Sequence, residues 1–168
     1  MARKRIKKQK PIQIIVGEGF AEKAFILYVR SIYSNGNVSV KVKSAGGKGP
    51  KNVIMDAIGE FNSARGDIRV AALLDTDLEW PKTETKKAVS KGIVLLGSTP
   101  CLEGLLLDIL EIAHPIPPSA KNYKKKAHGY LTGPETDKDS YCKHFGKEVL
   151  EKARLKIKEL DTLILLMC

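Results

Sequence analysis

The sequence contains little cysteine and no long apolar run. Its 168 residues include three cysteines, whose odd number and wide spacing exclude the disulfide framework of a small secreted protein and favour a reducing cytoplasm. No segment reaches the roughly 20 apolar residues that span a bilayer, and no signal-peptide core follows the basic start. The sequence therefore predicts a cytoplasmic protein that does not cross a membrane.

Paired cysteines of the zinc-binding type are lacking as well. Five side chains could ligate zinc: His114, His128, His144, Cys101 and Cys142. No two of them have Cys-x-x-Cys spacing, so surface or core positions are favoured over a zinc site.

Positive charge is in excess. The chain has 29 Lys and Arg against 19 Asp and Glu, a formal charge of +10 and a pI near 9.5, which favours a polyanionic partner such as nucleic acid or an anionic membrane surface. Residues 1–10 carry six Lys or Arg and form a basic tail that either binds nucleic acid or only keeps the protein soluble. A purely binding role is compatible with this charge.

From Pro11 onward, short apolar runs alternate with helical patterns. Strands are expected at 12–16, 38–42, 69–74 and 93–96, and helices at 20–33, 51–63, 83–90, 101–113 and 144–160. Phe20, Ala24, Leu27 and Ile32 are expected to form the buried face of the first helix. This alternation predicts a three-layer α/β/α domain with a parallel central sheet of about four strands. Its core spans residues 11–113, and residues 114–168 form a basic loop and a C-terminal helix that packs on the same domain.

Three acidic residues follow predicted strands. Glu18 comes after the first strand, and Asp75 and Asp77 come after the third, with a spacing that lets both carboxylates point the same way. Ligands of parallel sheets bind at the carboxyl ends of the strands, and crowded carboxylates attract a hard divalent cation. Taken singly, each acid is more often a helix cap or a turn former. Their joint placement after separate strands predicts a Mg²⁺ or Mn²⁺ site.

These residues resemble the TOPRIM domain, which has a glutamate after its first strand and Asp-x-Asp after its third. The matching segments are IIVGEG at 14–19 and LLDTD at 73–77. Within that superfamily the chain is similar to the RloB-like and OLD-nuclease-like branch, through STPCLE at 98–103.

The resemblance implies a metal-dependent nuclease that acts on phosphodiesters of DNA or RNA. It implies that Asp75 and Asp77 bind Mg²⁺ or Mn²⁺, that Glu18 is a further ligand or the general acid/base, and that Glu103 contacts a second metal or the substrate. It also implies a role in bacterial defence, linked to abortive infection or restriction, with an ATPase as a candidate partner protein.

Two further segments suit a nucleic-acid backbone. Lys48 lies in a glycine-rich loop at 45–50, which is either a plain turn or a phosphate contact. The second segment is basic and includes Tyr123, and its four lysines suit phosphate contacts as well as a solvated loop: Lys121, Lys124, Lys125 and Lys126.

Two other functions fit the same residues. A TOPRIM module without catalytic activity would bind nucleic acid or a partner protein. A phosphoacceptor signalling domain would also place an aspartate at position 75, but such domains need an acidic pair after the first strand, where only Glu18 stands.

Overall fold

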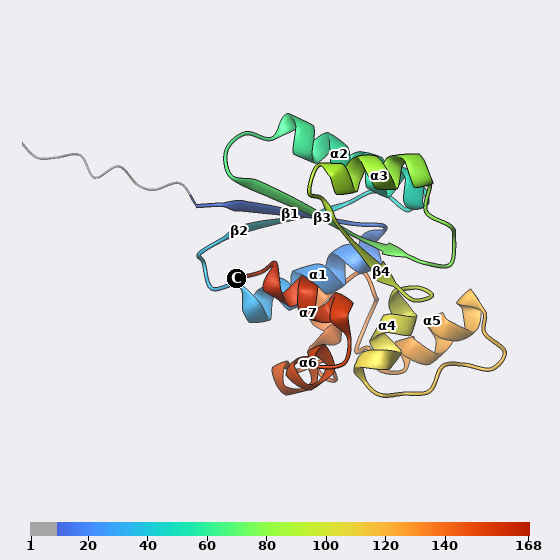
Figure 1. Cartoon of the computed structure of the whole chain (residues 1–168). Coiled ribbons are helices and arrows are strands. Elements are labelled where there is room, and N and C mark those ends of the chain that lie inside the picture. Colours follow the sequence, from blue (N-terminus) through green and yellow to red (C-terminus); the bar gives the residue numbers. More distant parts are fainter. Residues whose placement is uncertain (1–9) are drawn as a thin grey trace, which may run out of the picture.

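Four apolar segments form one parallel sheet. They are β1 (Ile12–Gly17), β2 (Ser39–Ser44), β3 (Ile68–Asp75) and β4 (Val94–Ser98), in the spatial order β2-β1-β3-β4. The structure, a computed structural model, describes residues 10–168 (Figure 1). The predicted basic tail at 1–10 therefore lies outside the described residues, apart from Lys10.

Helices cover both faces of this sheet, which confirms the predicted three-layer α/β/α fold (Figure 1). Helices α2 (Pro50–Ser63) and α3 (Lys82–Ser90) lie on one face. The other face is covered mainly by α1 (Phe20–Tyr33), α4 (Leu102–Ile109), α6 (Lys147–Arg154) and α7 (Lys158–Leu165). Two shorter elements complete the chain: α5 (Ala120–His128) and the 3-10 helix η1 (Lys138–Tyr141).

Side chains that alternate between the two faces of the sheet contribute to two hydrophobic cores, one on each face. In β1, Ile14 and Val16 pack against α2, whereas Ile15 points into the core beneath α1 and α7. Successive side chains of a strand point to opposite faces, so a strand buried on both sides must be apolar throughout.

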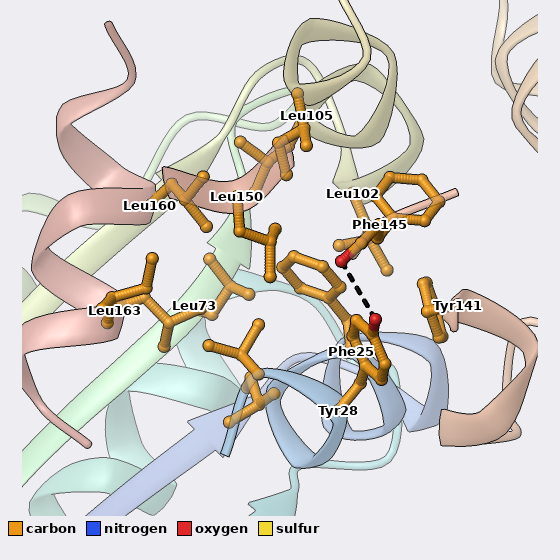
Figure 2. Packing of buried hydrophobic residues seen from close by; sticks show 14 of the residues in the cluster. Phe25, Tyr28, Leu73, Leu102, Leu105, Tyr141, Phe145, Leu150, Leu160 and Leu163 are labelled. Atoms are coloured by element: carbon orange, nitrogen blue, oxygen red, sulfur yellow. Dashed lines mark hydrogen bonds between the residues drawn. The ribbon is translucent and has the colours of Figure 1, made fainter. Parts of the chain in front are cut away.

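The larger core includes the C-terminal third of the chain. Tyr141 and Phe145 are fully buried and pack with Phe25 of α1, with ring centroids 5.5 Å apart for Phe25 and Tyr141. The Tyr28 hydroxyl donates a 2.9 Å hydrogen bond to the Phe145 carbonyl oxygen (Figure 2). Residues after 114 thus share one core with the sheet, through Leu73 among others.

Two predicted helices have different ends in the structure. The helix expected at 101–113 ends at Ile109, because Glu111 adopts a left-handed conformation with φ 57° and the Ile112 N–H bonds back to the Leu107 carbonyl at 2.9 Å. The helix expected at 144–160 is two helices, α6 and α7, separated near the exposed Leu155.

One predicted buried position was wrong. Phe20 is 63% exposed, and the buried face of α1 is formed instead by residues such as Phe25 and Val29. Within residues 10–168, no helix is both long enough and apolar enough to cross a bilayer.

Candidate functional site

The strand order reverses direction beside β1. From β1 the chain first adds β2 on one side and then crosses to add β3 on the other. In an open parallel sheet this reversal leaves a crevice at the carboxyl ends of the two strands, which is the usual ligand position. Glu18 directly follows β1 and Asp75 ends β3, so both residues lie at the edges of this crevice.

Glu18 and Asp75 are in direct contact. A Glu18 side-chain oxygen, Oε2, accepts a 2.9 Å hydrogen bond from the backbone N–H of Asp75. The backbone of Glu18 is held in turn by a 3.0 Å bond from its N–H to the Leu73 carbonyl. The structure therefore places the glutamate where the sequence predicted it, next to the end of the third strand.

The Asp75 carboxylate has few compensating donors. Asp75 pairs in register with Ser98 of β4, whose hydroxyl donates to Asp75 Oδ1 at 2.8 Å. The indole N–H of Trp80 donates to the Asp75 backbone carbonyl at 2.8 Å, which fixes the turn after the strand. No other hydrogen bond reaches this carboxylate from residues 10–168.

Several other acids surround Asp75. Burial, together with the charges of Glu22, Glu18 and Glu103, raises the pKa of Asp75 to about 7, against the lowering effect of the Ser98 hydroxyl. Burial also raises the pKa of Glu22, although its Oε2 accepts a 2.7 Å bond from the Gly19 N–H. The site therefore concentrates negative charge that protein donors only partly compensate.

Glu22, Asp75 and Glu103 line an open hollow of about 340 Å³, named here the acid cleft, whereas Glu18 lies beside it without lining it. Its lining includes five carboxylates and one lysine: Glu22, Asp75, Asp77, Glu103, Glu135 and Lys124. Cys101 also faces the cleft, and burial together with its hydrogen bond to Glu103 raises the pKa of its thiol to about 12. The thiol is therefore protonated at neutral pH.

Asp77 reaches the same cleft from an exposed turn. Its backbone N–H and that of Thr76 both donate to the Pro100 carbonyl at 3.0 Å, which ties the turn to the segment before α4. Within residues 10–168, no three carboxylate, imidazole or thiol groups lie close enough together to form a preassembled metal site. The donor chemistry nevertheless suits a hard cation, because the cleft offers carboxylate oxygens in excess of its cations.

Glu103 and Glu22 are both buried beside this cleft. Glu103, in the first turn of α4, is only 6% exposed and lines the cleft. Its predicted contact with a second metal or the substrate stays a prediction from the resemblance. Glu22 was missed by the sequence reasoning, because a glutamate three residues after Gly19 is the usual capping-box residue of a helix start. It does cap α1, and it also adds its charge to the site.

Of the predicted nucleic-acid contacts, only Lys124 lines the acid cleft, where it lies 3.8 Å from Glu135. Lys125 and Lys126 line a different hollow beside Ile116, and Lys121 is exposed on α5.

The glycine-rich loop touches the site through its backbone. The N–H of Gly47 donates to the Glu18 carbonyl at 2.8 Å, and those of Ala45 and Gly46 bond to Gly17 and Ser44. Three donors that a phosphate loop would offer are thus already used inside the protein, which favours the plain-turn interpretation. Lys48 is exposed at the end of this loop.

Two of the three histidines have side-chain hydrogen-bond partners. His114 contacts Asp108 at 2.8 Å and the Tyr123 hydroxyl at 3.0 Å, and His128 contacts Glu135 at 2.9 Å.

Comparison of the chain with protein-family models, with curated proteins and with solved structures found no match.

Proposed function

We propose that this protein is a metal-dependent, nuclease-like phosphodiesterase of TOPRIM type that acts on nucleic acid. The observation that supports it most is the group of carboxylates around Asp75 at the strand-order reversal, where burial and the neighbouring acids together raise the pKa of Asp75 to about 7. Structural carboxylates are usually paired with cations or hydrogen-bond donors. A crowded, poorly compensated group in a cleft is typical of a functional site.

The acids at the strand ends, in the cleft and beside it, divide into three roles under this proposal. Asp75 and Asp77 would hold Mg²⁺ or Mn²⁺, and Glu103 would hold a second ion or contact the substrate. When bound, such an ion supplies Lewis-acid activation of a phosphate oxygen and of an attacking water. Glu18 holds the Asp75 backbone in place and is the candidate general acid/base, because its Oε2 lies at the same strand ends.

A metal-titrated cleavage assay tests the proposal. Plasmid DNA, single-stranded DNA and structured RNA should be incubated with Mg²⁺ or Mn²⁺, and with EDTA as the metal-free control. Asp75→Asn and Asp77→Asn should abolish cleavage, as should Glu18→Gln. Asp56→Asn is a matched control, because Asp56 is exposed on α2, on the other face of the sheet. Cleavage that persists in the Asp75 and Asp77 variants would show that these carboxylates are not the active site, and absence of cleavage by the parent with either metal would rule the enzyme out.

A non-catalytic nucleic-acid-binding module is the second candidate. It is favoured by one observation, that no three donors among residues 10–168 are preassembled for a metal. This candidate predicts salt-dependent binding without cleavage and no rise in melting temperature when Mg²⁺ is added. An ATPase partner and a role in bacterial defence stay predictions from the resemblance.

A further inference from the structure

The acid cleft continues into a second hollow along α1. This hollow, of about 400 Å³ and named here the Phe20 groove, is lined by Phe20, Lys23, Ala24 and Leu27 and by residues 136–138. Phe20 and Thr136 line both the groove and the acid cleft. The two hollows therefore meet at these side chains.

The helical side of the groove combines an aromatic ring with a cation. Phe20, Lys23, Ala24 and Leu27 follow the i, i+3, i+4, i+7 spacing, so they share one face of α1. Ala24 at the base of this face is buried in the core and Lys23 and Leu27 are half-buried, whereas Phe20, at the first position of the helix, is 63% exposed. An exposed aromatic ring beside a lysine is suited to stacking with a nucleobase while the lysine contacts a phosphate.

The groove and the cleft differ in the charged side chains that line them. The cleft lining has five carboxylates and one lysine, whereas the groove lining has Lys23 and Lys138 against Asp137 alone. Lys23 has no ion-pair partner among residues 10–168, and Lys138 pairs with the neighbouring Asp139. A phosphate backbone therefore meets an unpaired lysine, Lys23, in the groove, whereas the carboxylates of the metal-free cleft repel it.

We infer that the Phe20 groove binds an unpaired stretch of DNA or RNA, with one base stacked on Phe20 and backbone phosphates on Lys23 and Lys138. An unpaired strand is required because the faces of duplex bases are covered by their neighbours, so a side chain on a helix surface cannot stack on them. The inference rests on the proposed function for one point, that the bound strand continues toward the acid cleft.

Binding without metal tests the groove independently of cleavage. Labelled oligothymidylate and oligouridylate of about 12 nucleotides, and a duplex of equal length, should be titrated in EDTA with fluorescence anisotropy as the readout. Both single strands should bind more tightly than the duplex, and a preference between them identifies DNA or RNA as the ligand. Phe20→Ala should weaken single-strand binding about ten-fold, whereas Phe20→Tyr should preserve it and Phe20→Leu should resemble the alanine variant.

The lysines are tested through the salt dependence of binding. Replacing Lys23 and Lys138 together by Gln should lower the slope of log affinity against log salt by about 1.4, since each phosphate contact on a single strand contributes about 0.7. Lys86→Gln and Val89→Ala are matched controls, because both residues are exposed on α3, across the sheet from α1 (Figure 1). These controls should leave affinity and slope unchanged.

The outcomes separate this inference from the proposed enzyme activity. If Phe20→Ala and the lysine pair weaken binding while the parent cleaves nothing, the groove is a binding site and the nuclease proposal fails. If the parent cleaves but these variants bind as the parent does, the groove inference is wrong and the nuclease proposal stands. Equal binding of duplex and single strand, or an unchanged affinity in Phe20→Ala, likewise overturns the inference.

Discussion

Replacing Asp75 by Asn should stabilise the metal-free protein. The two side chains have nearly the same shape, and the Asn Oδ1 still accepts the Ser98 hydroxyl that Asp75 accepts at 2.8 Å. The change removes a negative charge from a place where burial and the charges of Glu22, Glu18 and Glu103 disfavour it. The variant should therefore lose repulsion without losing a hydrogen bond.

The size of the effect follows from the pKa of Asp75. That pKa is about 7 instead of 3.8, a difference of about 3, which sets an upper limit of about 4 kcal/mol at ~1.4 kcal/mol per pKa unit. Asp75 is partly open to the solvent of the cleft, and solvent screening reduces this limit to roughly 2 kcal/mol. For a domain of this size, such a gain raises the melting temperature by about 6 °C.

The pH dependence has a definite sign. The folded-state pKa is raised, so the folded protein binds more protons than the unfolded chain between pH 3.8 and about 7. The contribution of Asp75 to stability is thus complete below pH 3.8 and is lost as the pH rises through about 7. The difference in melting temperature between Asp75→Asn and the parent should be near zero at pH 4 and greatest at pH 8.

Calorimetric or fluorescence melts in EDTA at several pH values measure this difference. Asp77→Asn is the matched control, because Asp77 is exposed on the same turn, and it should change the melting temperature little. Addition of Mg²⁺ should reverse the order, since an ion that binds only the native state stabilises the parent and not the variant. An Asp75→Asn variant that melts well below the parent at pH 8 in EDTA would show that the carboxylate is a structural cap.

Three further substitutions test the packing of the chain. Gly104→Ala should cost a few kcal/mol in urea unfolding, because its Cβ would lie 2.4 Å from the Thr99 carbonyl oxygen, whereas Gly59→Ala, with nothing within 4 Å, should stabilise α2 by about 0.5–1 kcal/mol. Tyr28→Phe should cost about 1–2 kcal/mol in the same assay, since it leaves the Phe145 carbonyl without its 2.9 Å donor. Equal stability of the Gly104 variant and the parent would contradict the close approach of these backbones.

The strands were predictable because their residues satisfy two requirements at once. The run from Ile12 to Val16 is apolar at every position except Gln13, as is typical of a strand buried on both faces, and glycine follows it directly. The same reasoning placed Asp75 at the end of β3, and the parallel register then brought it beside Ser98. The pattern of apolar residues therefore predicted most of the sheet, and the positions of acids at strand ends predicted the part of the site around Asp75.

The rest depended on tertiary contacts that leave no local signal. Helix α4 ends at Ile109 and is followed by Glu111 in a left-handed conformation, where glycine or asparagine is usual. Its end could therefore not be found from residue type. Phe20 has the residue type of a core position and was assigned to the core, but the groove leaves it exposed. Glu22 caps α1 through its bond from the Gly19 N–H, and this role alone accounts for a glutamate at that position. Its charge also raises the pKa of Asp75, because β3 and α4 approach it in the fold.

The distribution of charge connects the two proposals. A net charge of +10 would attract the proposed nucleic-acid ligand from a distance, yet five carboxylates at the cleft would repel the phosphate that has to enter it. A divalent cation bound among those carboxylates removes this repulsion, so metal and nucleic acid should each increase the affinity of the other. Thermodynamic linkage requires the two increases to be the same factor. In this protein the acids of the cleft would therefore make nucleic-acid binding dependent on the metal, while the Phe20 groove provides the part of the affinity that needs no metal.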